Sequence, residues 1–290
     1  KYLTKLPKNY YATETYTDKL INFIDEGKKD GKPFFAYVSH QAPHDPYHLP
    51  TEWRSRHVGE YDKGWDALRQ ERLKRQIELG IMPAGTQLAE RMWFIPDPLV
   101  LAPATRAFLG KKMELYAGMV ENMDFHVGRL IDHLKKIGEY DNTIFIVTAD
   151  HGDMLGERGL WYKMALFEHS ARVPLIMAGP GIAQGVVDNP CSLVDLLPTM
   201  LDFAETDGVA IPEMGLPIDG RSLTGLARGH AEEGGDAIAE YCAEMTGNPV
   251  FMIRRGALKY IACAGDPPLL YDVLADPGEQ RNLVNDPAFA

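Results

Sequence analysis

The sequence predicts an α/β layered domain, and three observations along residues 10–205 indicate it. Short apolar runs alternate with segments whose apolar residues recur every 3.6 positions, which is the pattern of strands layered with helices. Gly and Pro break the chain around these runs, as around buried strands. The two most polar, His-rich loops, residues 40–48 and 150–153, directly follow apolar runs. Because ligands of such sheets bind beyond the carboxyl ends of strands, these loops hold the candidate site.

The strongest predicted helix spans residues 113–134, where apolar side chains lie alternately three and four positions apart and Gly138 follows as a stop. We interpret this stripe as core. Ser192 is the expected N-cap of another helix, which Pro198 is expected to kink. Four Pro residues make residues 81–108 an irregular excursion. The predicted helices are residues 15–27, 51–80 (a charged helical stretch), 113–134 and 192–203.

Strands are predicted where apolar or β-branched residues form short runs between breakers. The run at residues 143–148 ends abruptly in Asp150-His151-Gly152-Asp153, and two runs around residues 255–257 indicate a hairpin. The predicted strands are residues 34–38, 143–148, 173–177, 250–254 and 258–263.

Length and composition limit the domain organisation. The chain has 290 residues, 45% of them apolar, which suffices for one large core or a large domain plus a small one. We expect a main α/β domain over residues 1–230, with an excursion at 51–110, and a smaller, acidic antiparallel-sheet subdomain over residues 231–290. Lys1 is neither an initiator Met nor part of a signal peptide, so we interpret the sequence as a piece of a longer one.

Charge and composition also limit the partners. A net charge of −11 argues against a nucleic-acid partner, and no apolar run approaches the roughly 18 residues that span a bilayer. Three scattered Cys residues predict neither a disulfide framework nor a zinc knuckle, and they favour the bacterial cytoplasm, with the periplasm as the alternative. A homo-oligomer using residues 51–108 as its interface is compatible with this pattern.

Asp150 and His151 are the candidate metal ligands. Adjacent side chains at a strand end point apart unless the chain turns, and Gly152 permits that turn, so both could reach one cation. The alternative is an Asp that caps the loop and a His that packs beside it.

His44 and Lys163 are the candidate catalytic residues. His44 lies between Pro43 and Pro46, which hold its imidazole in place, and with Asp45 beside it this side chain could protonate a leaving group. The alternative is a solvated loop His, which is also the interpretation of His48. Lys163, among aromatic and apolar residues, could act as a point charge on an anion or be a surface Lys.

The missing motifs exclude several enzyme classes. The sequence has no Gly-x-x-x-x-Gly-Lys-Ser/Thr phosphate loop, no Gly-x-Ser-x-Gly nucleophile elbow and no His-Glu-x-x-His pair. A Walker-type nucleotide site, the α/β-hydrolase class and this zinc-protease class are therefore not predicted.

Together these segments resemble the sulfatase family of the alkaline phosphatase superfamily. Residues 143–153 (TIFIVTADHGD) are similar to the family's metal-binding strand end, and residues 154–174 closely resemble choline sulfatases. Residues 61–86 and 116–124 (YAGMVENMD) resemble bacterial arylsulfatases instead. Further matches are residues 192–199 (SLVDLLPT), 219–223 (DGRSL) and 270–283 (LYDVLADPGEQRNL).

The resemblance implies an alkaline-phosphatase-like α/β/α sandwich with a mostly parallel mixed sheet and a small C-terminal α+β subdomain. It implies a sulfuric ester hydrolase in which Asp150 and His151 bind a divalent cation, Lys163 contacts the sulfate, and His44 stabilises or protonates the leaving alcohol. The cation is expected to be Ca²⁺, with Mn²⁺ or Mg²⁺ as alternatives. The partner is a small sulfate ester.

The sequence departs from the family at the nucleophile. The family forms it as formylglycine from a Cys or Ser in the motif Cys/Ser-x-Pro-x-Arg, and Cys191, Cys242 and Cys263 all lie in other contexts. We therefore expect that motif in an N-terminal part that precedes Lys1. Two alternatives stay open: a phosphonate monoester or phosphodiester hydrolase of the same superfamily, which His151 favours, and a catalytically inactive fragment.

Overall fold

The computed structural model describes residues 6, 8–88, 91, 95–155, 157–206, 215, 217–231, 234–243 and 246–289. By its internal contacts the chain divides into two compact units. Unit 1 comprises Lys1–Met82 and Pro96–Asn142, and unit 2 comprises Pro83–Ile95 and Thr143–Ala290. Each unit has a hydrophobic cluster of its own.

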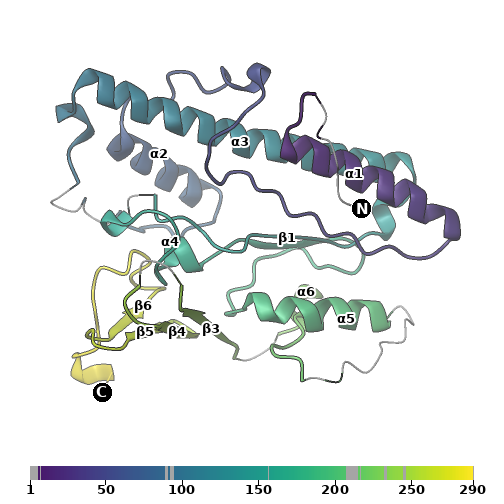
Figure 1. The fold of residues 1–290 in the computed structure, drawn as a ribbon. Coiled ribbons are helices and arrows are strands. Elements are labelled where there is room, and N and C mark those ends of the chain that lie inside the picture. The colour runs from purple at the N-terminus through teal and green to yellow at the C-terminus, as the bar shows by residue number, and fades with distance from the viewer. Residues whose placement is uncertain are drawn as a thin grey trace. The chain divides into compact units, whose positions relative to one another are not determined.

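Unit 1 is built from helices. The helices are α1 (Ala12–Gly27), α2 (Trp65–Glu78) and α3 (Pro103–Lys136), as the sequence predicts in type and approximate place. Helix α1 lies along α3 (Figure 1) and turns Leu20 and Ile24 inward, since these residues recur on one helical face. Short 3₁₀ turns occur in both units. Those of unit 1 are Lys28–Asp30, Thr51–Trp53, Pro98–Val100 and Tyr140–Asn142, and those of unit 2 are Glu157–Gly159, Leu193–Asp195 and Pro287–Phe289.

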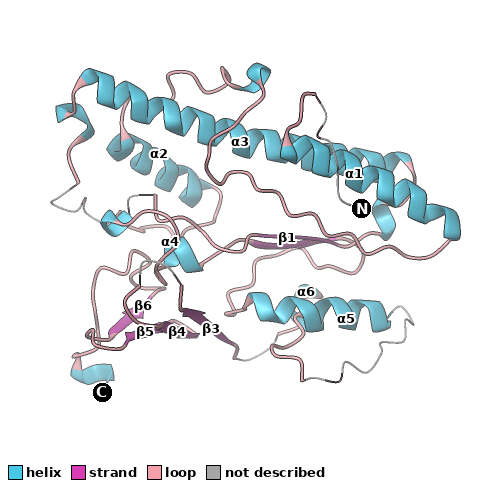
Figure 2. Cartoon of the chain, viewed as in Figure 1, coloured by secondary structure: helices cyan, strands magenta, loops and turns pink. Residues whose placement is uncertain are grey.

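Two predictions for unit 1 are wrong. Residues 34–38 form no strand and are drawn as loop in Figure 2, with Phe35 76% and Tyr37 80% exposed. An apolar run becomes a strand only where another segment accepts its backbone hydrogen bonds, and within the described residues none pairs with it. The irregular excursion also ends early, at Pro103, because Pro is compatible with the first helical position, where its missing N–H has no partner.

The most buried face of α3 is polar and not the predicted apolar stripe. Leu134 of that stripe is 2% exposed, but Val120 is 39% exposed. The face that packs inward repeats every fourth position because the loop after α1 lies against it: a Cβ on Gly118 would come within 2.7 Å of Leu49. Its members are Gly110, Glu114, Gly118, Asn122 and His126.

Unit 2 contains two sheets, the first made of β1 (Phe145–Thr148) and β2 (Leu175–Ala178). Both strands lie within about two residues of the predicted runs. They pair antiparallel, and the ladders of the described residues include no parallel pair, although a mostly parallel sheet is expected. An apolar run predicts that a segment forms a strand but not which segment pairs with it, since partners are chosen by tertiary packing.

The helix α4 (Glu168–Ala171) lies between these strands, and α5 (Leu196–Thr206) and α6 (Thr224–Ala227) follow β2. Ser192 caps as predicted, in a capping box with Asp195, although the capped segment is a 3₁₀ turn that leads into α5. Pro198 falls in the first turn of α5, where it needs no N–H partner.

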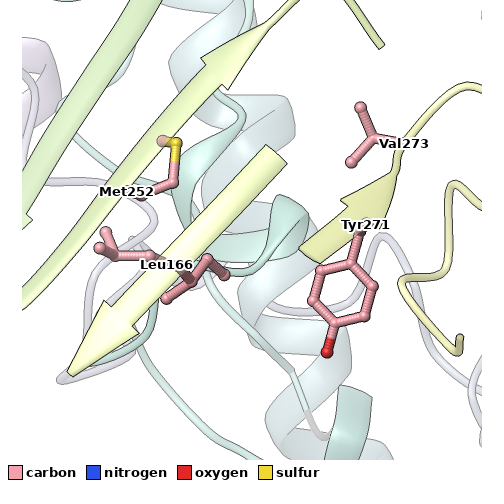
Figure 3. Packing of buried hydrophobic residues seen from close by; sticks show 5 residues of the cluster. Leu166, Met252, Tyr271 and Val273 are labelled. Carbon is pink, nitrogen blue, oxygen red and sulfur yellow. The ribbon is translucent and has the colours of Figure 1, made fainter. Parts of the chain in front are cut away.

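The second sheet of unit 2 is antiparallel in the order β3 (Asp236–Tyr241), β4 (Val250–Arg255), β5 (Leu258–Cys263) and β6 (Leu269–Asp272). The predicted hairpin is β4–β5, whereas β3 and β6 were not expected. The sheet lies inside the predicted C-terminal segment, and the predicted boundary at residue 230 stays a prediction. Its core joins residues of β4, β5 and β6, the residue just after β6 and one residue from the segment before α4 (Figure 3), namely Met252, Ile261, Tyr271, Val273 and Leu166.

Two further expectations from composition concern disulfides and membrane-spanning segments. All three cysteines are free thiols. Of the helices that the structure describes, none is long and apolar enough to cross a membrane.

Candidate functional site

Asp150 and His151 follow directly after β1, where the chain turns sharply. The Nδ1 atom of His151 lies 2.7 Å from the carbonyl oxygen of Gly152, so that nitrogen is the donor and the Nε2 atom keeps its lone pair. Nε2 lies 3.5 Å from Oδ2 of Asp150, whose side chain is 88% exposed. The two atoms thus offer adjacent donors to one cation, with the imidazole held in the ligating tautomer by a backbone acceptor.

Gly152 makes this turn sterically possible. A Cβ atom on Gly152 would lie 2.1 Å from the carbonyl oxygen of His169, far inside contact distance. The Gly152 amide also donates to the carbonyl oxygen of Ser170 at 2.8 Å. Position 152 therefore requires Gly for a more specific reason than predicted, because α4 closely approaches the turn.

Asp153 organises the loop that carries Lys163. Its Oδ1 accepts hydrogen bonds from the amides of Leu155, at 2.9 Å, and Tyr162, at 3.1 Å. The amide of Met154, which is fully buried, donates to the carbonyl oxygen of Tyr162 at 2.7 Å. These bonds bring the chain back to the end of β1 at Tyr162, and Lys163 is the next residue.

Lys163 is held through its backbone. Its carbonyl oxygen accepts from the hydroxyl of Ser170 at 2.8 Å and from the amide of Ala165 at 2.8 Å. Among the described residues its ammonium makes no hydrogen bond or ion pair, and its neighbours Trp161 and Tyr162 are 60% and 52% exposed. The ammonium is therefore available to an anion.

The support of this loop was not predicted from the sequence. Lys259 on β5 is fully buried, with its Nζ 2.9 Å from Glu168 and 2.9 Å from Glu279. Burial raises the pKa of Glu279, and the charge of Lys259 opposes that rise. Glu279 also accepts from the amide of Glu168, so the start of α4 is tied to the C-terminal sheet. The sequence does carry a signal for this pair. Lys259 lies two positions before the inward-facing Ile261, on the same face of the strand, and a Lys at such a position requires a buried partner.

His44 belongs to unit 1 and lies on an anchored loop. Ala42 and Leu49 are buried against Trp53 and Met119, which fixes both ends of the loop. The His44 side chain is 57% exposed, with Nδ1 2.7 Å from the Asp45 carbonyl oxygen and 3.2 Å from its carboxylate. In the part of the chain that is described, Nε2 makes no hydrogen bond, so it is the atom that can reach a substrate.

The predicted site residues therefore fall into two sets. Asp150, His151 and Lys163 are brought together by unit 2 through backbone bonds around Ser170. His44 is presented by unit 1.

The donor set fits part of a cation shell. Asp150 supplies a carboxylate and His151 a neutral imidazole nitrogen, which are ordinary ligands of divalent cations. Within the described residues, no group of three or more His, Cys, Asp or Glu is placed to hold a metal. Since Ca²⁺ takes about six to eight ligands, a complete shell needs further donors.

Solved structures define the class to which this fold belongs. One, in complex with its substrate D-glucosamine-2-N,6-O-disulfate, has a TM-score of 0.67 and 28% identity over 97% of this chain and 66% of its own. The phosphonate monoester hydrolase of Silicibacter pomeroyi has a TM-score of 0.64 and 27% identity over 96% of this chain and 57% of its own. The predicted alkaline-phosphatase-like α/β class is thus confirmed.

Within that class, the chain belongs to the sulfatase family. The sulfatase profile matches residues 1–206, and the C-terminal profile of N-sulphoglucosamine sulphohydrolase matches residues 156–290. Choline-sulfatase of Rhizobium meliloti is 37% identical over 88% of this chain and 47% of its own length. Arylsulfatase of Klebsiella aerogenes is 26% identical over 70% of this chain and 52% of its own. The chain thus spans about half the length of these relatives.

Proposed function

We propose that this chain forms the cation side and the leaving-group side of a sulfuric ester hydrolase that cleaves a small sulfate monoester. The observation that carries this is the Asp150–His151 turn, with a fixed imidazole tautomer 3.5 Å from a carboxylate oxygen and Lys163 bonded to the same turn through Ser170. The 37% identity to a choline-sulfatase supports choline-O-sulfate as the first substrate to test, with aryl sulfates second. We expect no nucleic-acid partner.

In the proposed reaction the ester S–O bond breaks as the nucleophile forms a new bond to sulfur, and the alcohol leaves. Lys163 neutralises the charge on the sulfuryl oxygens, where a point charge in place before the reaction lowers the barrier. His44 gives a proton from Nε2 to the departing alcohol oxygen, while Nδ1 stays hydrogen-bonded at Asp45.

Asp150 and His151 would hold a divalent cation, Ca²⁺ being favoured and Mn²⁺ or Mg²⁺ the alternatives. When bound, such a cation polarises the sulfuryl group and lowers the pKa of a nucleophile beside it. The nucleophile is proposed to be formylglycine from an upstream Cys/Ser-x-Pro-x-Arg motif.

The test uses the full-length protein, including its upstream coding sequence. Mass analysis of its peptides should find one Cys or Ser converted to an aldehyde, and sulfate should be released from choline-O-sulfate or an aryl sulfate. We expect His44→Ala and Lys163→Ala to lower kcat by about 10²-fold or more, as general acids and charge stabilisers do. His48→Ala, an exposed His of the same loop, should leave kcat unchanged. A protein without the motif and without turnover would be the inactive alternative.

A second candidate function is phosphonate monoester hydrolysis. The structural likeness to the Silicibacter pomeroyi enzyme and the His at position 151 favour it. Both substrates carry one negative charge but differ in the bond broken, S–O in one and P–O in the other, so the comparison of kcat/KM for a sulfate ester and a phosphonate monoester separates them. If kcat/KM is higher for the phosphonate monoester than for the sulfate ester, the phosphonate monoester would become the assigned substrate.

A further inference from the structure

Ser170 is the residue that touches both parts of the unit 2 site. It lies in α4 and is 3% exposed. Its hydroxyl donates to the Lys163 carbonyl oxygen at 2.8 Å, and its own carbonyl oxygen accepts from the Gly152 amide at 2.8 Å. One residue therefore connects the cation-side turn with the segment that carries the ammonium.

The helix turn that holds Ser170 is itself immobilised. The backbone amide of Ser170 donates to the carbonyl oxygen of Phe167 at 3.0 Å. Glu168, two residues before Ser170, binds the buried Lys259 at 2.9 Å. Arg158 lies over the ring of Phe167 at 4.2 Å from its centre, which adds a cation–π contact to this support. Ser170 thus has a fixed place relative to the C-terminal sheet.

We propose that Ser170 is a positioning residue, which sets the place of the Lys163 ammonium relative to the Asp150–His151 pair. This inference rests on the proposed function. The hydroxyl acts on the backbone of Lys163 alone, because the bond to Gly152 uses the Ser170 carbonyl, which a side-chain substitution leaves in place. A misplaced charge loses part of its effect on the transition state while substrate binding changes less, since positioning errors of about 1 Å reduce rates steeply.

A double-mutant cycle in the full-length protein tests this. Ser170→Ala should lower kcat about 10-fold and raise KM by a smaller factor, since removal of the hydroxyl leaves the Lys163 carbonyl held by the Ala165 amide alone. In the Lys163→Ala background the same substitution should lower kcat less than about 2-fold, because residues that act through one another are not additive. Equal factors in both backgrounds, or no effect of Ser170→Ala in the wild type, would overturn the proposal.

Two controls separate positioning from stability. Ser222→Ala removes a half-buried hydroxyl that donates to Asp202 at 2.6 Å and contacts no site residue, so kcat should not change. Ser170→Thr keeps the hydroxyl and should recover most of the kcat that Ser170→Ala loses. If it recovers folding, measured by thermal melting, but not kcat, the hydroxyl is structural only and the proposal fails.

A readout without turnover separates this proposal from the proposed function. Inorganic sulfate binding, measured by calorimetry, should weaken several-fold in Ser170→Ala and in Lys163→Ala but not in Ser222→Ala. If Lys163→Ala leaves both sulfate binding and kcat unchanged, the proposed role of Lys163 is wrong, and the role of Ser170 fails with it. If only Ser170→Ala is without effect, the proposed function stands and the positioning role alone is overturned.

Discussion

At the scale of single residues, one glycine decides whether the candidate cation turn can form. Gly152 is required by proximity, because a Cβ there would lie 2.1 Å from the His169 carbonyl oxygen. The sequence predicts a flexible residue at this place. Only the structure identifies the segment that comes close to it.

We expect Gly152→Ala to lower the free energy of unfolding by at least about 2 kcal/mol, the range of strain and overpacking effects, and to abolish turnover. Gly128→Ala is the matched control, because Gly128 lies inside α3 with nothing within 4 Å of an added Cβ. That substitution should stabilise the chain by about 0.5–1 kcal/mol. Urea denaturation measures both, and a shift of the same sign for the two would contradict the steric argument.

The residue types of the site were predictable, but their hydrogen bonds were not. Asp150, His151 and His44 stand out from the sequence by chemistry and by their place after apolar runs, and Lys163 stands out by its place among aromatic and apolar residues. The bond from His151 Nδ1 to Gly152, which selects the imidazole tautomer, depends on how the turn closes. Ser170 carries no sequence signal of its own, because its role arises from contacts with residues 7 and 18 positions away.

At the scale of elements, the inward face of α3 buries polar groups where an apolar stripe was expected. His126 is 4% exposed and accepts from Arg129 at 2.9 Å. Burial and the charge of Arg129 lower the pKa of His126, and Asp18 partly opposes them. Burial and the proximity of His126 also lower the pKa of His40.

The lowered pKa values predict a pH dependence of unit 1. The folded-state pKa of both His residues lies below their ordinary value of 6.5, so the unfolded chain binds more protons as pH falls. Their stabilising effect is therefore complete above about pH 6.5 and is lost as pH falls through the folded-state pKa. We expect the free energy of unfolding to drop between about pH 7 and pH 5.

Denaturation at a series of pH values checks this. His40→Gln combined with His126→Gln should flatten the pH dependence, whereas His48→Gln, which changes an exposed His, should not. A double variant with the slope of the wild type would contradict the assignment.

The strand β5 carries a second buried charge, at Lys259. Lys259→Met should lower the free energy of unfolding by about 3–5 kcal/mol, because it leaves the buried carboxylate of Glu279 without a counter-charge. Glu168 would keep only the more distant guanidinium groups of Arg172 and Arg254, each at 4.0 Å. Adding Glu168→Gln and Glu279→Gln should recover most of that loss. Arg255→Met, which breaks an exposed pair with Asp236, should change stability little. Equal stability of Lys259→Met and wild type in urea would refute the interpretation.

At the scale of the whole molecule, the proposed cation would couple the site to overall stability. A ligand at about 100 times its Kd raises the free energy of unfolding by about 2.7 kcal/mol, since it binds only the folded state. We expect Ca²⁺ to raise the Tm of the full-length protein and a chelator to reverse this. Asp150→Asn should remove most of the effect, and Asp188→Asn, in an exposed loop, should retain it. A Tm that responds to Mn²⁺ or Mg²⁺ instead of Ca²⁺ would reassign the metal.

The sequence by itself determined the α/β class, the four longest helices, most strands and the residue types of the candidate site. These follow from local patterns, since periodicity and residue type act over a few neighbouring positions. Only the tertiary structure decided that residues 34–38 are unpaired, that α3 buries a polar face, and that Lys259 and Ser170 hold the Lys163 loop. The physical reason is that ladders, buried ion pairs and close backbone approaches depend on which distant segments meet, and packing of the whole chain determines that.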